Sequence, residues 1–186
     1  MSAFTHLVWR SLLCSFLIGS TARAQVVINE FMASNQSTLA DEDGDYSDWI
    51  ELYNTTDATV PLNQWYLTDN ANNRTKWRFP DVSIPPHGYL IIFASDKNRT
   101  VPGQPLHTSW ALSAGGEYLG LIMPDGQTVV HEYAPNFPAQ FPDVSYGLLN
   151  GEHVFFQSPT PGAPNASGVV YAADPVFSHQ RGFYDE

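Results

Sequence analysis

Turn-forming residues interrupt residues 25–157 so often that no segment keeps a helical period. Gly, Pro, Asn and Asp separate short runs that are either apolar or alternate between apolar and polar residues. Alternation with a period of two is typical of a half-buried strand, and closely spaced turn signals favour a sandwich. The expected strands cover residues 26–31, 49–54, 60–68, 76–80, 89–94, 111–113, 117–123, 128–133, 145–148 and 153–156. We therefore expect an all-β sandwich of short strands.

Two local patterns make this expectation more specific. In the strand 49–54, Ile50 and Leu52 point to one face, while Trp49, Glu51 and Tyr53 point to the other. Residues 89–94 are apolar throughout, which predicts a central strand covered on both faces. The dipeptide Asp125-Gly126 predicts a tight hairpin turn, because glycine supplies the positive φ that this turn needs. Residues 32–39 and 96–108 are expected to be polar connections.

The N-terminal segment, residues 1–24, has the features of a secretory signal peptide. Arg10 precedes an apolar run over residues 12–18, and Ala22-Arg23-Ala24 forms a cleavage site before Gln25. The alternative is a membrane anchor, but the run is shorter than the roughly 20 residues that a span needs. We expect a secreted or cell-surface protein, with no membrane span after cleavage.

Cleavage would also change the charge and remove the single cysteine, Cys14. The mature chain then has no disulfide, thiol nucleophile or cysteine ligand. Loss of Arg10 and Arg23 leaves 6 of the 8 basic residues against 19 acidic ones, a formal net charge of −13. This charge argues against nucleic acid as a partner.

The predicted domain organisation follows from changes in composition. Residues 25–157 form the β-sandwich, and residues 158–168, rich in Pro, Gly and Ser, form an extended linker. Residues 169–186 are expected to be the truncated start of a second β domain or a disordered tail.

An acidic loop before the strand 49–54 is the candidate metal site. Asp41, Asp43, Asp45 and Asp48 lie close together around Gly44. Calcium takes six to eight oxygen ligands, which such carboxylates supply. The spacing differs from an EF-hand, because glycine is at the fourth position and Leu52 stands at the twelfth. The sequence predicts a structural calcium site here; the alternative is a solvated acidic turn.

Catalytic motifs are not recognisable, and we expect no enzyme. The histidines are scattered without a zinc-binding spacing, and the sequence has no Gly-x-Ser-x-Gly elbow. Aromatic residues suggest a different role: Trp49 and Trp110 are candidate rings for stacking on a carbohydrate. The alternative is that such rings support the core.

Six segments form a recognisable series along the sandwich: residues 28–35 (INEFMASN), 48–54 (DWIELYN), 62–69 (LNQWYLTD), 77–80 (WRFP), 84–90 (IPPHGYL) and 112–117 (LSAGGE). In sequence and order these segments resemble the bacterial lamin tail domain, an immunoglobulin-like sandwich. Their order covers nearly the whole sandwich. Residues 175–178 (PVFS) resemble the opening of a chitobiase C-terminal-like β domain.

The resemblance implies a non-enzymatic binding or architectural module with no catalytic residues. We expect it to serve adhesion, targeting or presentation of downstream domains in a longer secreted or surface protein. Its partner would be a protein or glycan at the cell surface. The alternative is a carbohydrate-binding accessory domain of a polysaccharide-active enzyme.

Overall fold

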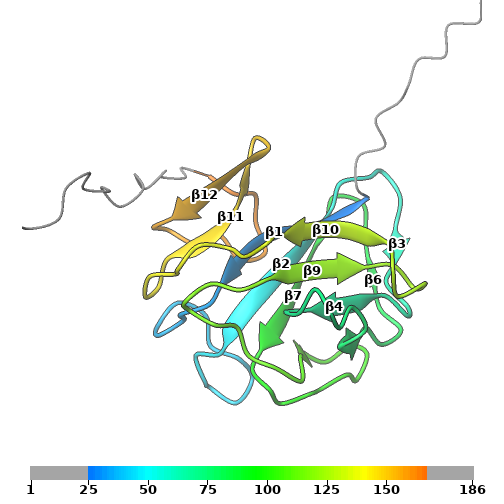
Figure 1. Ribbon diagram of the computed structural model, residues 1–186, viewed down its shortest axis with the longest axis horizontal. Helices are drawn as coiled ribbons and strands as arrows, with labels where there is room; N and C mark the ends of the chain where they lie inside the picture. The colour runs from blue at the N-terminus through cyan, green and yellow to red at the C-terminus, as the bar shows by residue number, and fades with distance from the viewer. Residues whose placement is uncertain (1–24, 167–186) are drawn as a thin grey trace, which may run out of the picture.

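A computed structural model describes residues 25–166, which form two main β-sheets packed face to face and contain no helix (Figure 1). The strands are β1 (Val26–Met32), β2 (Asp48–Asn54), β3 (Val60–Pro61), β4 (Tyr66–Thr68), β5 (Trp77–Arg78), β6 (Ser83–Ile84), β7 (Tyr89–Ala94), β8 (Leu106–His107), β9 (Leu119–Ile122), β10 (Val129–Tyr133), β11 (Ser145–Leu149) and β12 (Glu152–Phe156). This architecture confirms the all-β, immunoglobulin-like sandwich that the alternating pattern predicts. None of the described segments is a helix long and apolar enough to cross a membrane.

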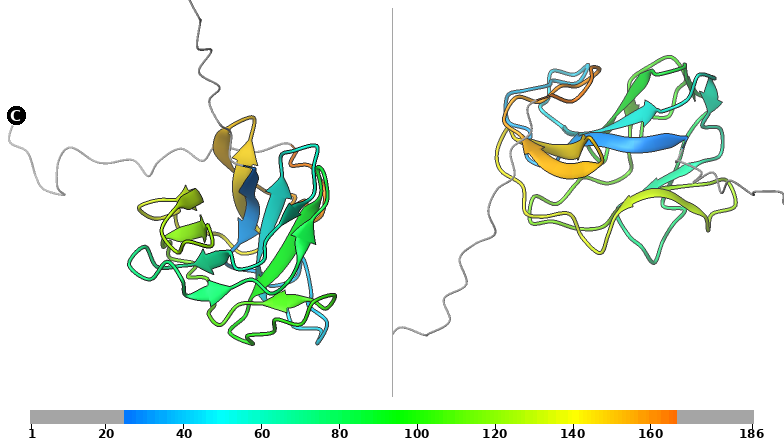
Figure 2. Two further views of the ribbon diagram at one scale, coloured as in Figure 1. Left: turned by 90° about the vertical axis from the view of Figure 1, so that its right-hand side faces the viewer. Right: turned by 90° about the horizontal axis from the view of Figure 1, so that it is seen from above.

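The larger sheet has the order β12-β11-β1-β2-β7-β8, and the smaller one has the order β10-β9-β4-β5. A separate two-stranded sheet pairs β3 with β6. Seen from above, the blue, cyan and gold strands of the larger sheet form one layer and the yellow-green strands form the other (Figure 2). The core lies between the layers, where Ile50 and Leu52 of β2 are fully buried together with Leu67 and Leu121 of the smaller sheet.

The alternation in β2 is confirmed. Ile50 and Leu52 belong to the main core, whereas Trp49 lies in a second cluster with Met32 and Phe93 on the other side of the larger sheet. In β7 the expected burial on both faces holds for Ile92, Phe93 and Ala94, while Tyr89, Leu90 and Ile91 are half-buried. The hairpin between β9 and β10 is also confirmed, with Gly126 at a φ of 68°.

Three of the expected strands and connections were wrong. Residues 60–68 form two strands, because the Trp65 amide donates to the Leu62 carbonyl and Gln64 adopts a φ of 66°. The expected loop 96–108 contains β8, which pairs in parallel with β7. Of residues 111–113, only Ala111 pairs, through an isolated bridge to Ser95. The alternation of apolar and polar residues does not predict a positive φ at a residue other than glycine. It also does not predict that two strands pair when a long loop separates them.

Residues 158–166, which we call the C-terminal strap, lie against the outer face of the larger sheet. The backbone amide and hydroxyl of Thr160 donate to the carboxylate of Glu30, and the Gly162 amide donates to that of Glu51. Asn165 donates to the carbonyls of Asn29 and Leu148. Part of the predicted linker 158–168 is therefore bound to the sheet. The predicted signal peptide (1–24) and second domain (169–186) lie outside the described residues.

Gly147 allows β11 to approach β1 closely. A Cβ at this position would overlap the Asn29 carbonyl oxygen and approach the Glu30 Cα to 2.8 Å. We therefore expect Gly147→Ala to destabilise the domain by about 1–3 kcal/mol, as overpacking does in well-packed sites. Urea unfolding measures the change. Gly115→Ala is the matched control, because its Cβ would meet only the Ser113 Oγ at 3.7 Å; equal losses in the two variants would contradict the argument.

Candidate functional site

The acidic loop is held in shape by its own first residue. One carboxylate oxygen of Asp41, Oδ1, accepts hydrogen bonds from the backbone amides of Asp43 and Asp45, both at 3.0 Å. The other oxygen, Oδ2, accepts from the Ser47 hydroxyl at 2.9 Å. Gly44 adopts a φ of 86° at the tip, which glycine reaches without steric cost. These bonds turn successive aspartate side chains toward one side of the loop.

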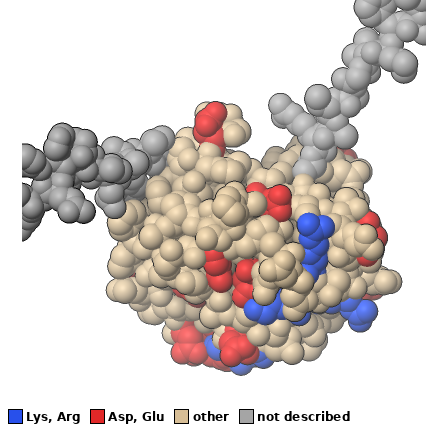
Figure 3. Space-filling view, in the orientation of Figure 1, with Lys and Arg blue, Asp and Glu red and all other residues tan. Residues whose placement is uncertain are grey.

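The ammonium group of Lys97, from the segment after β7, lies among three of the aspartates. Its Nζ is 2.6 Å from the carboxylate of Asp41, 2.8 Å from that of Asp43 and 2.9 Å from that of Asp45. The structure thus brings together three of the four predicted calcium ligands, and a lysine supplies the positive charge between them. In the space-filling view, basic and acidic side chains lie interspersed along the lower edge of the molecule (Figure 3).

The pKa values of this cluster follow from that geometry. Burial acts to raise the pKa of Asp41, but hydrogen bonds from Lys97, from Ser47 and from two backbone amides lower it to about 2. For Lys97, burial acts to lower the pKa, and the three carboxylates together raise it well above its usual value. Asp41 and Lys97 are consequently both charged at neutral pH.

Asp48, the fourth predicted ligand, does not join the cluster. It begins β2 on the face that Ile50 and Leu52 share, because side chains alternate along a strand. Its carboxylate accepts a hydrogen bond from the Asn35 amide at 3.1 Å. Burial raises the pKa of Asp48 to about 6, with the charge of Glu117 adding to the rise. This residue supports the turn before β2.

A second set of polar contacts extends from the loop to β8. The guanidinium of Arg99 pairs with the carboxylates of Glu42 and Asp43. The fully buried His107 places Nε2 at 2.9 Å from a Glu42 oxygen and Nδ1 at 2.7 Å from the Ser95 hydroxyl. Sequence reasoning missed these residues, since it treated 96–108 as a loop. The alternation of Lys97 and Arg99, in a chain with 8 basic residues, was an available signal.

The two predicted carbohydrate-stacking rings are part of the interior. Trp49 is fully buried and Trp110 is 4% exposed. Trp49 packs with Met32 and Phe93, and half-buried Leu39 from the segment before the acidic loop covers this cluster. Neither ring offers a face to a ligand, so the expected platform is wrong for these residues.

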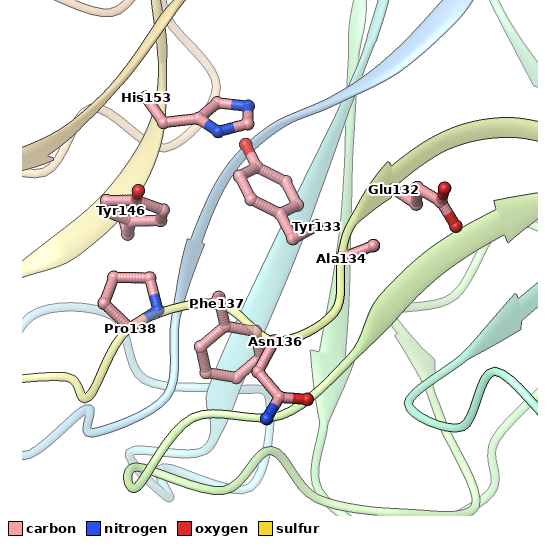
Figure 4. Close-up of a pocket in the computed structure, with 8 residues that line it drawn as sticks. All are labelled: Glu132, Tyr133, Ala134, Asn136, Phe137, Pro138, Tyr146 and His153. Carbon is pink, nitrogen blue, oxygen red and sulfur yellow. The ribbon is translucent and has the colours of Figure 1, made fainter.

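A pocket that sequence reasoning did not identify lies between the end of β10 and the hairpin β11–β12. Its volume is about 250 Å³, and aromatic rings of Tyr133, Phe137, Tyr146 and His153 contribute to its lining (Figure 4). The Tyr133 hydroxyl donates to the Ile28 carbonyl at 3.1 Å, which ties this side of the pocket to β1. The lining comes from three separate segments, which explains why no local motif indicates it.

Comparison with known families gives one match. Residues 19–136 match the family model described as Lamin Tail Domain, which is more than half of the 186-residue chain. No curated protein matches this chain. The matched region begins before β1 and includes the acidic loop and both layers of the sandwich up to the segment after β10.

Proposed function

The chain belongs to the lamin tail domain family, and from this membership we propose that it is a non-enzymatic, exported module that attaches to a cell-surface partner and presents downstream domains. The observation that carries the proposal is the C-terminal strap. Thr160, Gly162 and Asn165 are each hydrogen-bonded to the larger sheet. Whatever follows the strap therefore leaves the sandwich from a defined place, which suits an architectural role.

The ionisable groups near the acidic loop support a structural role. Lys97, Arg99 and His107 are each paired with carboxylates of residues 41–45, and both imidazole nitrogens of His107 have partners. The chain Ser95–His107–Glu42 follows the order of a hydrolase triad, but His107 is fully buried. An ester-hydrolysis rate that Ser95→Ala abolishes, measured with p-nitrophenyl acetate, would contradict the non-enzymatic role.

Surface attachment is tested with a reporter fused after Glu186 and produced with the chain's own N-terminus. We expect reporter activity in the cell-envelope fraction. Deleting residues 25–157 leaves the predicted signal peptide in place and should move the reporter into the culture medium. Replacing these residues with an unrelated β-sandwich is the matched control. Identical distribution of all three proteins would show that the domain makes no attachment.

The strap is predicted to loosen when Asn165 is replaced by alanine. The Asn165 amide donates to Asn29 and Leu148 at 3.0 and 2.8 Å, and each such bond contributes roughly 0.5–1.5 kcal/mol. We expect amide hydrogen exchange at Thr160 and Gly162 to accelerate at least about tenfold. Asn72→Ala, in an exposed loop, is the control. Unchanged exchange in Asn165→Ala would show that the strap is held by other contacts.

Calcium remains a prediction for this domain. Because the Lys97 ammonium lies between the carboxylates of Asp41, Asp43 and Asp45, we expect Ca²⁺ to bind only in competition with it. Attachment through Trp49 and Trp110 is not proposed, since both rings are buried.

A further inference from the structure

Aromatic residues line the pocket beside β10: Tyr133 and Phe137 are buried in its floor, and the rings of half-buried Tyr146 and exposed His153 are open to a ligand. The ring centroids of Tyr133 and His153 lie 4.6 Å apart, and those of Tyr133 and Tyr146 lie 5.8 Å apart. Phe137 and Pro138, from the segment after β10, lie on the side opposite His153 (Figure 4). The volume of about 250 Å³ is below the roughly 300–1,000 Å³ of sites for drug-sized ligands. It therefore suits a ligand of about one ring.

The polar groups of the lining are free to bind a ligand. Within residues 25–166, the side chains of Asn136, Tyr146 and His153 make no hydrogen bond to one another or to other described residues. Glu132 also belongs to the lining, but its carboxylate accepts from the Tyr118 hydroxyl at 2.7 Å and points away from Tyr133, Tyr146 and His153 (Figure 4). An amide, a phenol and an imidazole thus belong to the lining of one small volume.

The charge of the pocket excludes an anionic ligand. Its lining includes the Glu132 carboxylate and neither Lys nor Arg. Partial desolvation lowers the pKa of His153, and burial with the nearby His153 lowers the pKa of His131 to about 4. Both imidazoles are therefore uncharged at neutral pH. A phosphate or carboxylate would find no cation in the lining.

We propose that this pocket binds one pyranose unit of a neutral glycan. A pyranose has an apolar face of C–H groups, which packs on aromatic rings such as Tyr146. Its hydroxyls donate to His153 and accept from the Asn136 amide. This assignment rests on the proposed attachment function, because it names the ligand class through which the module would bind a surface.

The test uses the mature chain from Gln25 to Glu186 and NMR titration with glucose, galactose, mannose and N-acetylglucosamine. We expect at least one sugar to bind with a millimolar dissociation constant and to shift the signals of Asn136, Tyr146 and His153. Inorganic phosphate and choline chloride are titrated in parallel. Phosphate should cause no shift at these residues, and a response to choline without any sugar response would identify an organic-cation site and overturn the proposal.

Matched variants locate the binding. Asn136→Ala and His153→Ala remove exposed side chains of the pocket, and each is expected to weaken sugar binding at least about tenfold. Tyr146→Phe keeps the ring packed against Phe155 and removes only the hydroxyl. Asn72→Ala and His87→Ala alter the same residue types in exposed loops elsewhere and should bind like the original protein. Thermal melting confirms that each variant is folded.

The outcomes distinguish this proposal from the proposed function. If no sugar in the set shifts the pocket signals, or if the pocket variants bind as tightly as the controls, the pocket does not bind a glycan. If no sugar binds but the reporter still stays with the cell envelope, the module attaches through another surface. Sugar binding without envelope retention would support the pocket and contradict attachment.

Discussion

Replacing Lys97 with methionine should destabilise the domain in calcium-free buffer, and added Ca²⁺ should restore much of the loss. Methionine keeps the length of the side chain and removes its charge. Carboxylate oxygens of Asp41, Asp43 and Asp45 lie within 4.8 Å of one another, so the variant leaves three like charges together. Removing one partner of a buried ion pair costs about 3–5 kcal/mol. We expect a smaller loss of about 1–3 kcal/mol, because only Asp41 is buried and the side chains of Asp43 and Asp45 are 40% and 66% exposed.

Calcium should rescue this variant because the three carboxylates are already oriented toward one point. They supply oxygen ligands, and water completes the six to eight positions that Ca²⁺ requires. An ion at one hundred times its dissociation constant stabilises the folded state by about 2.7 kcal/mol. Urea unfolding of the variant in chelator and in millimolar Ca²⁺ measures the rescue.

Lys76→Met is the matched control, since Lys76 pairs with the single carboxylate of Asp69 in another loop. It should lose stability without a response to calcium. Unaltered stability of Lys97→Met in chelator, or the absence of a calcium response in it, would contradict the account of the cluster. A higher midpoint of the original protein in Ca²⁺ would show that the ion displaces the lysine, as the acidic pattern predicts.

The second large effect concerns Glu51, which faces Glu30 directly across β1 and β2. Both side chains are fully buried beneath the C-terminal strap. Burial raises the pKa of Glu51 to about 7, the charge of Glu30 adds to the rise, and hydrogen bonds from Asn29 and Gly162 oppose it. Burial also raises the pKa of Glu30. Like charges opposite each other on neighbouring strands destabilise a sheet.

The direction of the pH effect follows from proton binding. Between pH 4.5 and about 7 the folded state binds more protons at Glu51 than the unfolded state does, so stability falls as the pH rises through this window. The pKa difference corresponds to a loss on the order of 3 kcal/mol. Glu51→Gln cannot ionise, and it should therefore remove this part of the loss between pH 5 and pH 8.

Urea unfolding at pH 5, 6, 7 and 8 provides the comparison. The stability difference between Glu51→Gln and the original protein should shift in favour of the variant as the pH rises. At pH 5 the variant should be the less stable protein, because glutamine cannot accept from both Asn29 and Gly162. Glu152→Gln, in an exposed position of β12, is the control and should run parallel to the original. If the stability of Glu51→Gln changes with pH in the same way as that of the original protein, ionisation of Glu51 does not destabilise the domain.

Local patterns were sufficient for the strands and for one turn. Alternation in residues 49–54 placed Ile50 and Leu52 on one face and Trp49 and Glu51 on the other, and the structure agrees. Asp125-Gly126 indicated the hairpin between β9 and β10. These features depend on neighbouring residues alone, through backbone sterics and the alternation of side chains.

The candidate site was predicted only in part. The acidic pattern correctly grouped Asp41, Asp43 and Asp45, which the loop brings together. It could not reveal Lys97, which stands 56 residues from Asp41 in the chain. The acidic pattern also included Asp48, because closeness in the sequence does not distinguish a loop residue from the first residue of a strand.

The sequence by itself determined the sandwich class, the inward face of β2 and the clustering of the acidic loop. Tertiary structure alone decided what covers the outer face of the larger sheet: the segment before β2 buries Trp49, and the strap buries Glu30 and Glu51. Period-two alternation tells which side chains share a face, but it carries no information about what packs on that face. Burial, and with it the pKa of Glu51 and the inaccessibility of Trp49, arises from contacts between segments distant in the chain.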